Sequence, residues 1–158
     1  MEKGKEKLIK EFENRFEEFK KDYGFKSTLE ELDEAFHIRD SVKKDGFLST
    51  RLARQVCYRI VENFMGWNDY LHSLIMPNPQ NMLNISESKV FNGDEKKGIT
   101  ELMKTAMRIS SKNGLNGLKK EKDEEAKFID ESLKIWNKLF KPKLIEVMTK
   151  INNEWSKK

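Results

Sequence analysis

The chain has 158 residues, of which 37% are hydrophobic and 37% are charged, and its formal net charge is +4. A chain of this length can bury one hydrophobic core without cross-links, and its single cysteine, Cys57, excludes an internal disulfide scaffold and a cysteine-based zinc site. No apolar run approaches the roughly 20 residues of a membrane-spanning helix, and the N-terminus lacks the apolar segment of a secretory signal. We therefore expect one cytoplasmic domain over residues 1–158.

Two amphipathic helices are predicted before Gly46. Apolar side chains recur at three- and four-residue spacing between residues 5 and 23, which is the pattern of a helix with one buried face. Ser27 and Glu30 then fit a capping box, in which each side chain accepts a hydrogen bond from the backbone of the other residue. A second helix should follow to about Lys44 and end near Gly46, because glycine commonly follows the last helical turn.

The third predicted helix should be the central one. It runs from a cap at Ser49 or Thr50 to about Ile75, and its apolar face repeats at helical spacing throughout. Pro77 and Pro79 must end it, because proline lacks the N–H group that continues the helical hydrogen bonds.

A long polar loop is predicted over residues 77–97, which contain four asparagines and two prolines and are therefore rich in turn-forming residues. Loops of this length are uncommon in compact domains and are often functional. A fourth helix is expected over residues 98–112, ending at Asn113-Gly114, and a last helix from about Lys119 that is kinked or broken at Pro142. Since no strand alternation is visible, the sequence predicts an all-α bundle of about five helices.

The first functional hypothesis concerns a basic helix face, because four of the six arginines lie between residues 38 and 59. One arc of the third helix, together with two preceding lysines, groups the candidates Arg51, Arg54, Tyr58, Arg59, Lys43 and Lys44. An arginine guanidinium can donate two parallel hydrogen bonds to phosphate oxygens, and a tyrosine ring can stack on a base. This face could therefore bind RNA or DNA. Against this, acidic residues interrupt the patch, and the arginines could instead pair with the acidic segment at residues 30–34 or with neighbouring helices.

The second hypothesis concerns the only two histidines. Glu34 and His37, like Asp69 and His72, are three residues apart, a spacing that places both side chains on one helix face and that di-iron bundle proteins use in pairs. These four residues could serve a metal-dependent bundle enzyme. The alternative is two surface histidines, because this spacing arises easily by chance in a helical chain with 27 acidic residues.

The third hypothesis concerns large aromatic side chains on the terminal helices: Phe12, Phe16, Phe19, Trp136, Phe140 and Trp155. Burial in the chain's own core is the ordinary explanation. The alternative is that these helices pair with a protein partner or with a second copy of the chain.

No sequence motif specifies a reaction or a cofactor. The chain has no glycine-rich phosphate loop, no H-E-x-x-H and no G-x-S-x-G, and Cys57 lies toward the apolar face of its helix. The favoured prediction is therefore a non-enzymatic protein-interaction or self-associating module, supported by the aromatic anchors and the loop at 77–97. Nucleic-acid binding and a metal-dependent enzyme are the alternatives.

Overall fold

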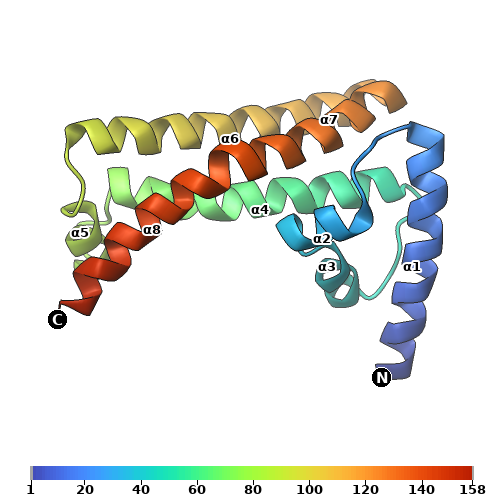
Figure 1. Cartoon of the computed structure of the whole chain (residues 1–158), viewed down its shortest axis with the longest axis horizontal. Coiled ribbons are helices and arrows are strands. Elements are labelled where there is room, and N and C mark those ends of the chain that lie inside the picture. Colours follow the sequence, from blue (N-terminus) through green and yellow to red (C-terminus); the bar gives the residue numbers. More distant parts are fainter. Residues whose placement is uncertain (1, 158) are drawn as a thin grey trace.

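The computed structural model describes residues 2–157, which form an all-α structure without a strand (Figure 1). Within this range no helix combines the length and the hydropathy that crossing a membrane would require. In chain order the elements are α1 (Glu2–Tyr23), α2 (Leu29–Phe36), α3 (Ile38–Asp45), α4 (Leu52–Ile75), α5 (Met82–Ser88), α6 (Gly93–Lys119), α7 (Lys122–Ile135), the π-helical turn η1 (Trp136–Phe140) and α8 (Lys141–Ser156).

Helix α4 is the central element, since it packs against α1, α2, α3, α5, α6 and α7. Helices α4 and α6 lie side by side and run in opposite directions, while α1 lies across the direction of α4 (Figure 1). The continuous segment α7–η1–α8 first runs back alongside α6, then diverges from it and ends beside α5 (Figure 1). The structure therefore contains short helices in addition to the five that were predicted. In Figure 1 the last helix, α8, runs obliquely to α4 and α6.

Aromatic side chains form much of the core. Phe64 is fully buried, and its ring centroid lies 5.0 Å from that of Phe140 and 5.6 Å from that of Trp136. Phe12 and Phe16 are fully buried as well, with centroids 6.0 Å apart in an edge-to-face pair. The core explanation is thus confirmed for Phe12, Phe16, Phe19, Trp136 and Phe140, whereas Trp155 is only partly buried against the core.

The prediction of a single second helix is wrong, because the structure contains two short helices, α2 and α3, that meet at His37. His37 adopts a left-handed backbone conformation with φ of 54°. Asp33 serves both helices: its carbonyl oxygen accepts the His37 N–H, and its carboxylate accepts the Arg39 N–H at 2.8 Å. The capping box of α2 is formed by Thr28 and Glu31, one residue later than predicted.

The predicted loop at 77–97 is largely helical. Asn81 caps α5 by accepting two backbone N–H groups, and Asn92 forms a capping box with Glu95 at the start of α6. The Ser88 hydroxyl donates to the Leu74 carbonyl at 2.7 Å, which docks α5 on the end of α4. Two of the four asparagines that suggested turns, Asn81 and Asn92, are therefore N-cap residues, a role for which asparagine is equally suited.

Helix α6 continues through Asn113 and Gly114, where the sequence predicted its end. Tertiary contacts explain the difference, because the Arg54 guanidinium donates to the Asn113 carbonyl at 3.1 Å and lies 3.0 Å from the position that a Cβ of Gly117 would occupy. The absence of a side chain at Gly117 lets Arg54 lie against the helix. The helix ends at Lys119, and its C-cap residue Lys120 has a left-handed backbone with φ of 59°.

Pro142 disturbs the last helix at the predicted place, but through a π-helical turn. The Lys141 N–H donates to the Trp136 carbonyl, one residue further back than in an α-helix. A proline ring clashes with the carbonyl four residues earlier, here that of Lys138, and the wider turn accommodates the ring without ending the helix.

Candidate functional site

The two central arginines of the predicted nucleic-acid face, Arg54 and Arg59, form contacts with other helices of the chain. Arg54 turns toward α7, with Nη1 lying 3.6 Å from Oε1 of the buried Glu125. Arg59 donates from Nε to the Phe36 carbonyl at 2.8 Å and so closes the end of α2. The candidates that stay exposed are Arg51, Tyr58, Lys43 and Lys44. Of the three arginines on this face, only Arg51 therefore keeps an exposed side chain.

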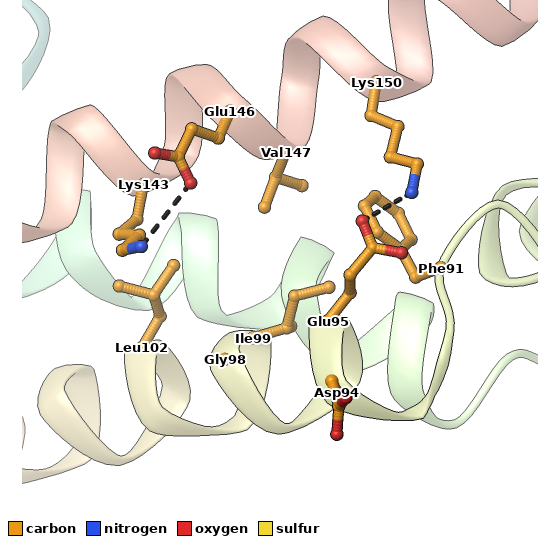
Figure 2. A pocket seen from close by; sticks show the side chains of 10 residues that line it. All are labelled: Phe91, Asp94, Glu95, Gly98, Ile99, Leu102, Lys143, Glu146, Val147 and Lys150. Atoms are coloured by element: carbon orange, nitrogen blue, oxygen red, sulfur yellow. Dashed lines mark hydrogen bonds and ion pairs between the residues drawn. The ribbon is translucent and has the colours of Figure 1, made fainter.

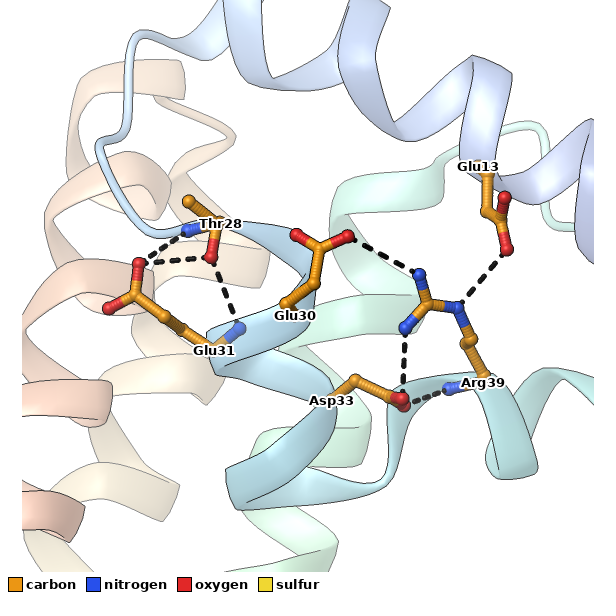
Figure 3. Close-up of polar contacts among 6 residues, drawn as sticks. All are labelled: Glu13, Thr28, Glu30, Glu31, Asp33 and Arg39. Carbon is orange, nitrogen blue, oxygen red and sulfur yellow. Dashed lines mark hydrogen bonds and ion pairs between the residues drawn. The ribbon is translucent and has the colours of Figure 1, made fainter.

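The acidic segment at residues 30–34 pairs with Arg39 and not with the arginines of α4 (Figure 3). The Arg39 guanidinium lies 3.0 Å from Asp33, 3.6 Å from Glu30 and 3.2 Å from Glu13. Because these three carboxylates belong to α1 and α2, Arg39 links both helices to α3.

The two carboxylate–histidine pairs do not converge. Glu34, His37, Asp69 and His72 are all exposed, the first two where α2 meets α3 and the others on α4. Among residues 2–157, no three histidine, cysteine, aspartate or glutamate side chains are placed so that they could share a metal ion. Cys57 is fully buried, and burial raises the pKa of its thiol to about 12, which makes it a poor nucleophile.

A groove between α6 and α8 is the candidate site. It has a volume of about 320 Å³ and lies where α8 diverges from α6 (Figures 1 and 2). Buried apolar side chains form its floor: Phe91, Ile99, Leu102 and Val147. Gly98 also lines the groove, and no heavy atom lies within 4 Å of the position that its Cβ would occupy. The floor is therefore open to an incoming side chain above Gly98.

The walls of this α6–α8 groove carry charge (Figure 2). Asp94 and Glu95 stand on the α6 wall, and Lys143 and Lys150 on the α8 wall, where Lys143 lies 3.5 Å from Glu146 of the same helix. The ion pair between Glu95 and Lys150 joins the two walls at one end of the groove. The groove thus has an apolar floor and walls of predominantly opposite charge.

The Glu95–Lys150 ion pair makes the stability of the fold depend on pH. The hydrogen bond from Lys150, followed by the bond from the Asn92 N–H, lowers the pKa of the Glu95 carboxyl below its usual value. Because the folded-state pKa is lowered, this pair stabilises the fold at neutral pH, and its contribution is lost as the pH falls through the lowered pKa. We expect Lys150→Met to raise the Glu95 titration midpoint in a carboxyl NMR titration. Lys143→Met is the control and should leave it unchanged; an unshifted midpoint in Lys150→Met would contradict the assignment.

The α8 wall is fixed at its far end by Glu87 of α5. One carboxylate oxygen of Glu87 accepts the Tyr70 hydroxyl at 3.0 Å, and the other accepts the Trp155 indole N–H at 2.8 Å. Helices α4, α5 and α8 are therefore joined through one side chain. Sequence reasoning missed this contact because Glu87 lies 17 residues from Tyr70 and 68 residues from Trp155.

Comparison with protein-family models, with curated proteins and with solved structures gave no match. The residues that line the groove include no histidine, cysteine, serine or threonine. Its ionisable groups are lysines and carboxylates that largely pair with one another. Such an arrangement suits binding better than acid–base or nucleophilic chemistry.

Proposed function

We propose that the chain is a protein-interaction module that binds an amphipathic helix of another protein in the α6–α8 groove. The observation that carries the proposal is the apolar floor left open above Gly98 between two charged walls. Protein interfaces commonly combine an apolar centre with a polar rim, and grooves of this kind take up the apolar face of a helix.

The charge of the walls defines the partner. Asp94 and Glu95 favour lysine or arginine on one flank of the bound helix, whereas Lys143 and Lys150 favour aspartate or glutamate on the other flank. The bound helix would have to exchange the Glu95–Lys150 and Lys143–Glu146 ion pairs for its own contacts. Between these flanks the helix would present a row of apolar side chains, one of them above Gly98. Opposite charge on the two flanks also fixes the direction in which the helix lies.

A second copy of the chain is the less favoured occupant. The aromatic side chains that suggested self-association, including Phe16 and Phe140, are fully buried in the chain's own core. We therefore expect a monomer in a native mass spectrum. A dimer that Gly98→Trp converts to monomer would instead identify the occupant of the groove as a second copy.

A tryptophan at position 98 should block the groove without disturbing the fold, because Gly98 is exposed and has free space beside it. Gly114→Trp is the matched control, since Gly114 lies on the same helix, is exposed and has no heavy atom within 4 Å of its Cβ position. A random peptide library selected on the unmodified chain should yield amphipathic helical peptides. We expect Gly98→Trp to weaken their binding about tenfold or more, as for a residue at the centre of an interface.

Comparing peptide binding by Gly98→Trp and Gly114→Trp tests the proposal. Gly114→Trp should bind the selected peptides as tightly as the unmodified chain does. Equal binding to both tryptophan variants, or a library that yields no binding peptide, would overturn the α6–α8 groove as the interaction site. Circular dichroism of both variants controls for loss of helix.

A further inference from the structure

A second cavity lies further along α6, where this helix faces α7 and η1. It has a volume of about 360 Å³, within the range of roughly 300–1,000 Å³ that small-molecule sites occupy. Its apolar lining consists of Ile109, Phe128, Ile135 and Leu139. None of its lining residues belongs to the α6–α8 groove, so the two sites can be tested separately.

Arg108 supplies an oriented positive charge at this cavity. Its Nη2 donates to the Thr105 hydroxyl at 3.2 Å, and this hydroxyl donates in turn to the Glu101 carbonyl at 3.0 Å. Thr105 is only 5% exposed, so the group that orients the guanidinium is held firmly. Within residues 2–157 no carboxylate forms an ion pair with Arg108, which leaves its other donors free for a ligand.

Ser132 gives the cavity a second polar group. Its side chain lines the cavity and is only 2% exposed, yet its hydroxyl makes no hydrogen bond within the described part of the chain. A ligand atom that accepts a hydrogen bond from this hydroxyl would give it a partner.

We propose that this cavity binds a small monocarboxylate with an unbranched apolar tail. The carboxylate would accept hydrogen bonds from the free donors of Arg108 and from the Ser132 hydroxyl, and the tail would lie against Phe128, Ile135 and Leu139. The other charges nearby favour a single negative charge on the ligand. Lys112 is already paired with Glu124 at 3.1 Å, and Glu131, which lines the cavity, repels a doubly charged phosphate or dicarboxylate more strongly than a monocarboxylate.

An NMR titration of backbone amides tests the head group with octanoate, octylamine and octanol. These compounds share an unbranched tail, and each is used at a concentration at which it is monomeric. We expect octanoate to bind and to shift amides around Ile109 and Phe128, and the amine and the alcohol to bind at least about tenfold more weakly, as loss of a charge-assisted hydrogen bond predicts. Arg108→Gln should weaken octanoate to the same extent. Arg51→Gln is the matched control, because Arg51 is also exposed and without an ion pair in residues 2–157 but lies outside this cavity.

Three results would overturn the site. The first is octylamine binding as tightly as octanoate, and the second is Arg108→Gln leaving octanoate affinity unchanged. The third is amide shifts that appear only with octanoate in phosphatidylcholine vesicles and not with the monomeric acid, which would indicate a lipid surface instead of a cavity. Ser132→Ala, which removes the hydroxyl, provides a second variant and should weaken octanoate by a smaller factor than Arg108→Gln does.

Discussion

Replacing Asp130 with alanine is expected to lower the free energy of unfolding by about 3 kcal/mol. The Asp130 carboxylate, on α7, accepts the Lys26 N–H at 2.9 Å, the Ser27 N–H at 2.9 Å and the Ser27 hydroxyl at 2.6 Å. These bonds tie the connection between α1 and α2 to a helix about a hundred residues away. Because Ser27 is only 6% exposed, removing the carboxylate leaves buried donors without an acceptor.

Urea unfolding followed by circular dichroism measures this effect. Asp130→Asn keeps one oxygen acceptor in nearly the same shape, so it should lose about half as much stability as Asp130→Ala. Asp123→Ala is the control, since Asp123 is an exposed carboxylate in the first turn of the same helix, where its contribution is at most about 1 kcal/mol. If Asp130→Ala were no less stable than Asp123→Ala, the contact would have no structural role.

Asp130 also explains why the sequence placed the start of α2 one residue too early. Ser27 and Glu30 have the spacing of a capping box, but the Ser27 hydroxyl is bound to Asp130, and Thr28 caps the helix instead. Local rules could not supply a partner 103 residues away. The end of α4 was predicted correctly, because Pro77 acts on its own neighbours.

The α6–α8 groove was missed for a related reason. Its two walls, at Glu95 and Lys150, are 55 residues apart in the chain, and helical periodicity relates side chains only along one helix. One local signal was present: Asn92 and Glu95 have the capping-box spacing and mark the true start of α6. Reading that signal would have placed Asp94 and Glu95 on the same helix as Gly98, although not beside α8.

Arg54 and Glu125 give the second large prediction. Arg54→Met is expected to lower the free energy of unfolding by about 3 kcal/mol, because it leaves the Glu125 carboxylate buried without a counter-charge. Glu125 is 3% exposed and cannot reach water, whereas 23% of the Arg54 side chain is exposed. Glu125→Leu should therefore cost clearly less than Arg54→Met, since the guanidinium can turn toward solvent.

The double variant allows the interaction energy between Arg54 and Glu125 to be measured apart from the effect of each single substitution. Arg54 Nη1 and Glu125 Oε2 are buried without a hydrogen-bond partner among residues 2–157, so the attraction between the two charges offsets only part of their desolvation. Arg54→Met combined with Glu125→Leu is thus expected within about 1 kcal/mol of the unmodified chain. Additive losses in a double-mutant cycle would contradict direct coupling. If Arg54→Met unfolded at the same urea concentration as the unmodified chain, Arg54 would have no structural role, and the nucleic-acid hypothesis for the α4 face would regain its central arginine.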